Sequence, residues 1–442
     1  MEGRPKKSYN LGSRGWILVI YQAVAFFAQT MFKNYPLNYL SGYFGGSQTI
    51  SLLCTVAMLV GVAVQLLCAK RIGRVKNMKR LGLILGIISM AFGLGVMAIP
   101  PKNLVLWQIF YFLTCTIVTV WATFPLGILV GQWFPRRKGT VMGIATFAFP
   151  IANACGSFFA KAALGETPRI FGAFLPYFIA VVIGMILGAI FVTDYPEQCG
   201  AYRDNDKNMT PEIANKMLEQ EIENKKTTVW TPKHTMATRD FWFITIPMGL
   251  LLMTSVGMMT QTAAILVQYG IIPGTGQFTG TMMGISGIAC LGSWVLGVLD
   301  TKFGTKLAIL ISVIIMTLGG VFGSINNLAC LMVALACLGL FMGAASNFTV
   351  SSAAQYWRRE DFSSVYANIN PIANIFGSLG PMVIAWVVAI TNARIAYMVV
   401  GICGVISIIL ILLFKPSHVK EVDDKYREAA GKPLDDVLAG RK

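Results

Sequence analysis

The sequence Pro150-Ile151-Ala152-Asn153, followed by Gly156-Ser157, occurs again as Pro371-Ile372-Ala373-Asn374, followed by Gly377-Ser378. The two copies are separated by half of the 442-residue chain. Similar residues precede each copy: Gln132-Trp133-Phe134 with Arg136-Arg137, and Gln355-Tyr356-Trp357 with Arg358-Arg359. Matches at one fixed offset are the signature of an internal repeat. The chain is therefore expected to contain two similar halves.

The composition indicates the environment of both halves. Hydrophobic residues make up 55% of the chain and charged residues 13%, and the mean hydropathy is +0.64. A soluble domain has about a quarter of its residues charged, so a soluble globular enzyme is excluded. The charges gather in short segments between long uncharged stretches. This pattern predicts an all-α polytopic membrane protein.

Apolar runs of about 20 residues are long enough to cross a bilayer as helices. Twelve such spans are predicted, at 16–40, 49–69, 81–98, 104–132, 140–161, 170–193, 241–270, 278–299, 307–324, 328–355, 363–390 and 394–414. Six of them separate the two copies of the repeat, and an even number gives both copies the same orientation. Two six-helix bundles related in this way are typical of transporters that work by alternating access.

The segments between the spans complete the expected organisation. Residues 1–193 form an N-terminal six-helix bundle, 194–240 a cytoplasmic linker, 241–414 a C-terminal six-helix bundle, and 415–442 a polar, partly disordered cytoplasmic tail. Within the linker, Thr210-Pro211-Glu212 predicts the start of a short helix. The glycine pairs Gly127/Gly131 and Gly339/Gly343 predict close helix packing.

The distribution of basic residues predicts the orientation. Of the 36 Lys and Arg, all fall on one side of the predicted spans except Lys33, Lys102, Lys161, Arg169 and Arg394. By the positive-inside rule, both termini are cytoplasmic. The same rule accounts for the net charge of +16 without a nucleic-acid partner. We expect a monomeric protein of the plasma membrane whose partners are lipid and a small substrate.

Three groups of residues resemble the major facilitator superfamily, and within it the oxalate:formate antiporters and monocarboxylate transporters. One is the loop after the second span, Lys70-Arg71-Ile72-Gly73-Arg74, with a counterpart at Asp300 to Lys306. Another is Trp133-Phe134-Pro135-Arg136-Arg137-Lys138-Gly139. The third is Gly15-Trp16, which opens the first span, with Lys33 at the place of a functional lysine in monocarboxylate transporters. The resemblance implies the twelve-helix fold and alternating access.

Two departures from those families bear on the mechanism. The loop after the second span has Lys70 where the superfamily normally has an acid, whereas Glu360 and Asp361 open the eleventh span. In one interpretation these residues form a cytoplasmic gate in which the acidic and basic positions have exchanged places. In the other, the two acids only stabilise the N-terminus of their own helix. The expected gating residues are Lys70, Arg71, Arg74, Arg136, Arg137, Asp300, Glu360 and Asp361. In addition, the eighth span lacks the charged residue that both families place there.

The membrane core contains no acid. Of the 20 Asp and Glu, only Glu166 lies outside the cytoplasmic segments, and His234 and His418 are cytoplasmic too. This absence weighs against an exporter of cationic drugs. Lys33 lies 17 residues after Trp16, about 25 Å along a helix. It is either an anion ligand in a wet cavity or a lysine that extends to the outer headgroups.

Other polar residues near membrane depth are candidates to orient a carboxylate. The predicted substrate-binding set is Lys33, Gln29, Asn34, Tyr35, Asn153, Lys161, Gln261, Asn347 and Asn374. For Lys161, contact with the headgroups is the stronger interpretation. Asn153 and Asn374 each follow a proline by three residues, so they either face the cavity or satisfy a backbone carbonyl that the proline leaves free.

These observations predict a secondary transporter of an organic anion, from small monocarboxylates through aromatic to steroidal acids. Export of neutral or amphipathic drugs through an apolar pocket is the alternative, and a non-transporting sensor is a third hypothesis. No constellation of nucleophile, base or metal ligands suggests an enzyme, and the nine cysteines include no CxxC pair. We therefore expect no cofactor and no metal site. Proton symport, exchange and uniport all remain open.

Overall fold

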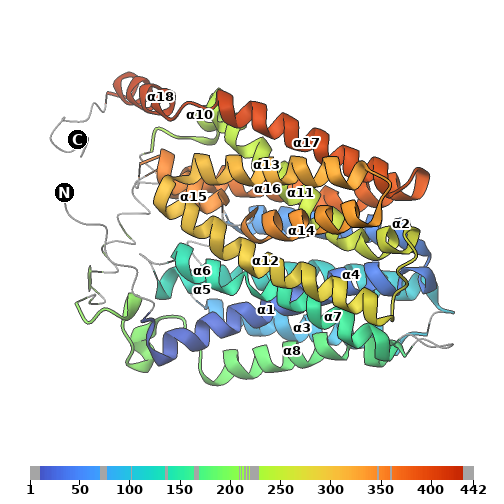
Figure 1. Ribbon diagram of the computed structural model, residues 1–442. Helices are drawn as coiled ribbons and strands as arrows, with labels where there is room; N and C mark the ends of the chain where they lie inside the picture. Colours follow the sequence, from blue (N-terminus) through green and yellow to red (C-terminus); the bar gives the residue numbers. More distant parts are fainter. Residues whose placement is uncertain are drawn as a thin grey trace. The chain divides into compact units, whose positions relative to one another are not determined.

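A computed structural model describes residues 10–69, 77–100, 102–134, 138–163, 169–208, 210, 212–213, 216, 219, 228–345, 348–358 and 361–431. Every regular element in this part of the chain is a helix (Figure 1). Ten of the helices are long and apolar enough to cross a membrane, and two shorter apolar helices add to them. The predicted all-α membrane fold is confirmed.

The helices of the first half follow the predicted spans closely. They are α1 (Gly12–Tyr39), α2 (Gly46–Ala69), α3 (Met78–Ala98), α4 (Leu104–Thr123), α5 (Pro125–Trp133), α6 (Lys138–Ala145), α7 (Ala148–Ala163) and α8 (Ile170–Ile190). The span predicted at 104–132 is divided into α4 and α5 because Pro125 begins a new helix and cannot donate a backbone hydrogen bond. The span predicted at 140–161 is likewise divided, just before Pro150 in the first turn of α7.

The second half repeats this pattern. Its helices are α10 (Pro232–Ala237), α11 (Arg239–Gln268), α12 (Gly276–Phe303), α13 (Thr305–Ser324), α14 (Leu328–Ala345), α15 (Phe348–Tyr356), α16 (Phe362–Ile390), α17 (Ala393–Leu413) and α18 (Pro416–Ala429). The span predicted at 328–355 corresponds to α14 and α15, and the two residues between these helices lie outside the described residues. The helix predicted near residue 210 lies mostly outside the described residues, although the Thr210 hydroxyl accepts a hydrogen bond from the Ile213 N–H at 3.3 Å.

The chain forms two compact units. The first contains Met1–Lys216 with Met259–Ser286, and the second contains Met217–Met258 with Gly287–Lys442. Helices α11 and α12 therefore contribute one part to each unit. In the first unit α1 packs against α4, α7 and α8, and in the second α13 packs against α14 and α17.

Close helix packing is absent at Gly127 and occurs at glycines of the second unit for which it was not predicted. A Cβ added at Gly127 would meet no atom within 4 Å, so the close approach predicted there is wrong. In the second unit, a Cβ at Gly320 of α13 would lie 2.3 Å from the Gly401 nitrogen of α17. The backbones of α13 and α17 therefore touch directly, as small residues permit in membrane helices.

Part of the segment after Lys415 is an ordered helix, and residues 432–442 lie outside the described residues. Its residues Pro416–Ala429 form α18, which buries Val419, Asp423 and Arg427. These three positions are four residues apart and so lie on one helix face. The tail thus contains an ordered helix that turns two charged side chains, Asp423 and Arg427, toward the rest of the second unit.

Candidate substrate site in the first unit

Lys33 lies in the interior of the first unit. Its side chain is 8% exposed, and its ammonium group lies near the thiols of Cys54 on α2 and Cys115 on α4. Because the side chain is covered by protein, the interpretation in which Lys33 extends to the outer headgroups does not hold. No carboxylate pairs with the ammonium group among the residues that the structure describes.

Aromatic side chains surround the helix segment that carries Lys33. The ring of Phe32 stacks on Tyr111 of α4 with centroids 5.4 Å apart, and it packs against Tyr177 of α8 at 4.7 Å. Tyr111 in turn stacks on Trp107 at 5.1 Å. These contacts fix α1 against α4 and α8 at the residue next to Lys33, in an apolar interior where an unpaired charge is costly.

A small cavity lies on another face of the same helix. It encloses about 10 Å³, which is about the space of one water molecule. Its lining comprises Thr30, Met31, Asn34, Asn38, Tyr39, Ala152, Asn153, Gly156 and Met282. Asn34 donates a hydrogen bond from Nδ2 to Oδ1 of Asn153 at 3.0 Å. Two predicted substrate ligands, from α1 and α7, therefore meet at this cavity, and a substrate larger than water requires it to open.

Asn38 joins α1 to α11. Its Nδ2 donates to the Met259 carbonyl at 3.1 Å, and its Oδ1 accepts from the Ala263 N–H at 3.0 Å. These two backbone groups are four residues apart in α11, so one amide bridges a pair that normally bond to each other within a helix. Asn38 is 7% exposed, and its bonds therefore form away from water.

Gln261 uses both ends of its amide within the first unit. Its Oε1 accepts from the Ser47 hydroxyl at 2.8 Å, and its Nε2 donates to the Ser51 hydroxyl at 3.1 Å. The side chain is buried. Its predicted role as a substrate ligand requires these bonds to be exchanged for bonds to substrate.

The remaining predicted substrate ligands are not among the described residues that line the small cavity. Gln29 is buried in α1, one helical turn before Lys33. Asn374, in the second unit, donates to the Asn370 carbonyl at 2.8 Å. The side chains of Tyr35 and Lys161, and all of Asn347, lie outside the described residues.

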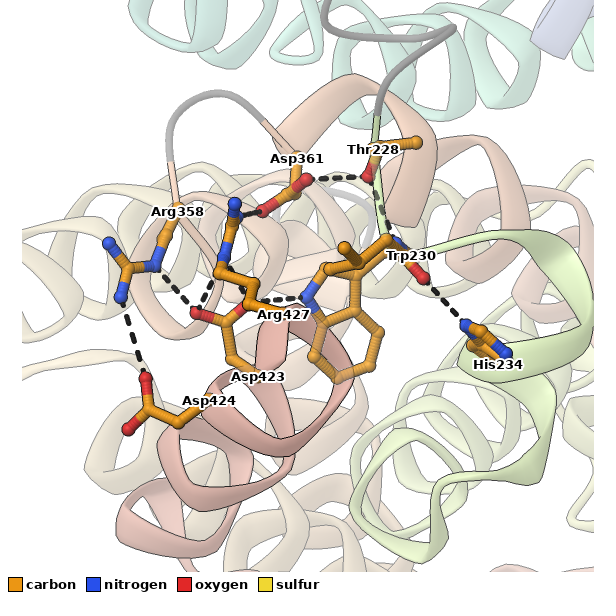
Figure 2. Close-up of polar contacts among 9 residues, drawn as sticks. Thr228, Trp230, His234, Arg358, Asp361, Asp423, Asp424 and Arg427 are labelled. Atoms are coloured by element: carbon orange, nitrogen blue, oxygen red, sulfur yellow. Dashed lines mark hydrogen bonds and ion pairs between the residues drawn. The ribbon is translucent and has the colours of Figure 1, made fainter. Parts of the chain in front are cut away.

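Only two of the predicted gating residues are described, and both are hydrogen-bonded within the second unit. Asp300 accepts from the hydroxyls of Thr305 at 2.6 Å and Ser351 at 2.7 Å. Asp361 accepts from Arg427 and Thr228 (Figure 2). The other predicted gating residues, Lys70, Arg71, Arg74, Arg136, Arg137 and Glu360, lie outside the described residues.

Sequence reasoning missed several residues of this region. Cys54, Cys115, Ser47 and Ser51 carry no signal in an apolar span, because small polar residues are common there. Met282 was missed because an apolar side chain is the ordinary residue of a membrane span. Their proximity to Lys33, Gln261 and the cavity comes only from helix packing.

Replacing Asn38 with alanine is expected to lower the free energy of unfolding by about 1–3 kcal/mol, because the two buried hydrogen bonds that join α1 to α11 are lost. Thermal denaturation of the purified protein measures this loss. Asn326→Ala is the matched control, since Asn326 is exposed in the loop after α13. Equal melting temperatures for the two variants would contradict the bridging role of Asn38.

The comparisons with known proteins agree on the fold. The profile of the Major Facilitator Superfamily matches residues 17–299 and 250–440. A bacterial homologue of the human lysosomal transporter Spinster, in an inward-facing and unoccupied conformation, is 14% identical, with a TM-score of 0.59 over 98% of this chain and 100% of its own. The proton:xylose symporter XylE, bound to 6-bromo-6-deoxy-D-glucose, is 15% identical, with a TM-score of 0.64 over 92% of this chain and 98% of its own. No curated protein sequence matches the chain.

Proposed function

Because the chain belongs to the major facilitator superfamily, a family of membrane transporters, we propose that it moves an organic anion, most simply a carboxylate. The observation that carries this proposal is Lys33, a cation that is 8% exposed and has no carboxylate partner among the described residues. Burying an unpaired charge is expensive. A substrate anion would offset that cost, so the site is complete only when an anion is bound.

The surroundings of Lys33 fit a carboxylate with an apolar body. Aromatic rings such as Phe32 and Tyr111 would provide the apolar contact. The amides of Asn34 and Asn153, which line the small cavity on another face of α1, would orient polar atoms once that cavity opens. Lysine serves as a point charge with rotatable donors, which suits acids of different shapes. The position of Lys33 after Gly15-Trp16 favours substrates like those of the monocarboxylate and oxalate:formate families.

Transport by alternating access also needs a gate on the cytoplasmic side. We place Asp361 there with Asp300, Glu360 and the basic residues Lys70, Arg71, Arg74, Arg136 and Arg137. Both termini face the cytoplasm of a cell whose plasma membrane holds the protein. Exchange and uniport need no titratable group beyond Lys33, and symport would use Lys33 or the substrate as the proton carrier.

A thermal-stability screen of the purified protein tests the substrate class. The panel contains acetate, benzoate and cholate, each beside a neutral amide of the same size, together with xylose. Saturation at about 100 times the dissociation constant stabilises a folded protein by about 2.7 kcal/mol. One of the acids is expected to raise the melting temperature, and its amide is not.

Two outcomes of the same screen would contradict the proposal. Stabilisation by the amides or by xylose, without any effect of the acids, would assign the protein a neutral substrate. Stabilisation by an acid that persists in Lys33→Gln would place the anion elsewhere.

A further inference from the structure

The second unit contains a pocket at a place where several apolar helices end. Its volume is about 340 Å³, which is within the range of small-molecule sites. Residues from the end of α12, the start of α13, the end of α15 and the start of α18 line it (helices labelled in Figure 1). The apolar spans Gly276–Asp300 and Thr305–Ser324 meet here, and Ala393–Leu413 ends just before α18. The pocket therefore lies at the level of a bilayer surface.

Hydrogen-bond donors dominate the lining of this pocket. Its polar side chains are those of Lys306, Gln355, Tyr356 and Lys420, and each of them can donate. Two of the four are cations, and no acidic side chain is among the described residues that line the pocket. Donors and positive charges without an acid favour an anionic ligand.

The contacts of these side chains leave donors for a ligand. The ammonium group of Lys306 donates to the Phe414 carbonyl at 2.7 Å, which uses one of its three donors. The Tyr356 hydroxyl accepts from the Lys306 N–H, so its own proton can point elsewhere. Gln355 accepts through Oε1 from the Thr305 N–H at 2.6 Å. The acceptor end of this amide is therefore occupied, and its Nε2 is the end that suits an anion.

The turn between α12 and α13 fixes the shape of one wall. Gly304 has a φ of +94°, a conformation that favours glycine, and a Cβ there would lie 3.0 Å from Nε2 of Gln355. Asp300, the acid closest in chain position to this turn, accepts from the hydroxyls of Thr305 at 2.6 Å and Ser351 at 2.7 Å. The wall is thus formed before a ligand binds, and hydroxyl groups already satisfy the carboxylate behind it.

An apolar surface adjoins the pocket. Phe303 lines it and is 65% exposed. The exposed side chains of Leu307, Ile314 and Leu318 follow along α13, and their spacing of seven and four residues places them on one helix face. Exposed apolar side chains on a membrane-spanning helix suit contact with acyl chains. This face begins at the residue directly after Lys306.

We infer that the pocket binds the headgroup of an anionic phospholipid. The phosphate accepts hydrogen bonds from Lys306 and Lys420, and Gln355 and Tyr356 donate to its remaining oxygens. The acyl chains run along the face that begins at Leu307. A soluble phosphate compound would use the same donors but not the apolar face, whereas basic pockets at a membrane surface suit lipid headgroups. The inference does not depend on the substrate proposed above.

The test counts the lipids bound to the full-length protein in detergent by native mass spectrometry. The probes are dioleoyl phosphatidylglycerol and dioleoyl phosphatidylcholine, which has the same chains and a phosphate but no net charge, with inorganic phosphate as a competitor. The variants are Lys420→Gln and Lys306→Gln, with Lys425→Gln as the matched control. Lys425 is exposed on α18, as Lys420 is, and it does not line the pocket.

One phosphatidylglycerol is expected to bind per chain, at least about tenfold more tightly than phosphatidylcholine, and inorganic phosphate should not displace it. Lys420→Gln and Lys306→Gln should each weaken this binding at least about tenfold, because each removes a charge-assisted hydrogen bond. Lys425→Gln removes the same charge outside the pocket. It should weaken binding by no more than about fivefold, which is the general attraction of one surface lysine for anionic lipid.

Three results would overturn the inference. Equal binding of the two lipids would show that the pocket does not select a negative headgroup. Displacement of phosphatidylglycerol by inorganic phosphate would assign the donors to a soluble phosphate compound. Equal losses in Lys420→Gln and Lys425→Gln would reduce the effect to general charge attraction. If Lys306→Gln is unstable because it loses the bond to Phe414, Lys420→Gln, whose side chain is exposed, decides the result.

Discussion

Replacing Lys33 with glutamine is expected to reduce the uptake of organic anions into proteoliposomes by about 100-fold or more. Losing one partner of a buried charge pair costs about 2–5 kcal/mol, and Lys33 is the buried cation that would face the substrate. Uptake of the acid identified by the stability screen, measured as an initial rate with labelled compound, provides the test.

The stability of the same variant gives a second, opposite expectation. Without substrate, Lys33 is a buried charge that no described carboxylate balances, so its removal relieves a desolvation cost. Purified Lys33→Gln should therefore melt at a temperature equal to or above that of the unmodified protein. A loss of uptake that is accompanied by a fall in melting temperature would point to a structural role for Lys33.

Lys102→Gln is the control for charge. Lys102 is exposed in the loop before α4, and its replacement removes the same charge without touching the site. Uptake by this variant should equal that of the unmodified protein. Full uptake by Lys33→Gln would remove the substrate role proposed for Lys33.

Replacing Gly320 with alanine is expected to lower the free energy of unfolding by about 3 kcal/mol or more. Replacing it with a larger residue is expected to prevent folding. The added Cβ would lie 2.3 Å from the Gly401 nitrogen, 2.4 Å from its Cα and 2.9 Å from the Tyr397 carbonyl. All three are backbone atoms, so relief requires α13 and α17 to move apart. Overpacking of this kind typically costs 1–3 kcal/mol or more.

Gly287→Ala is the matched control in α12. A Cβ at Gly287 would meet no atom within 4 Å, and alanine favours a helix over glycine by about 1 kcal/mol. Thermal or denaturant unfolding in detergent should show this variant to be as stable as the unmodified protein or more so. Equal losses in Gly320→Ala and Gly287→Ala would show that the α13–α17 contact does not decide stability.

The twelve spans were predictable because their signal is local. A run of about 20 apolar residues is long enough for the bilayer, whatever the rest of the chain does. The breaks that the structure describes inside two of these spans were harder to predict. Pro125 and Pro150 lie beside them, but a proline within a membrane helix is often tolerated, as Pro176 in the interior of α8 illustrates.

The site was predictable in its residue types and not in its arrangement. A lone lysine in an apolar span identifies Lys33 as a residue of interest. Its neighbours Cys54 and Cys115 lie on other helices, and the sequence contains no signal that brings them to it. The partners of Gln261 and Asn38 are hidden in the same way, because a hydrogen bond between helices depends on their rotation about their own axes.

The sequence by itself determined the membrane class, the internal repeat and the place of Lys33 in the first span, since these depend on composition and on position along the chain. The tertiary structure alone decided that Lys33 is buried, that Gly320 rather than Gly127 meets another backbone, and that Arg427 pairs with Asp361. Each of these results depends on which faces of distant helices meet, and the packing of the whole unit sets that contact.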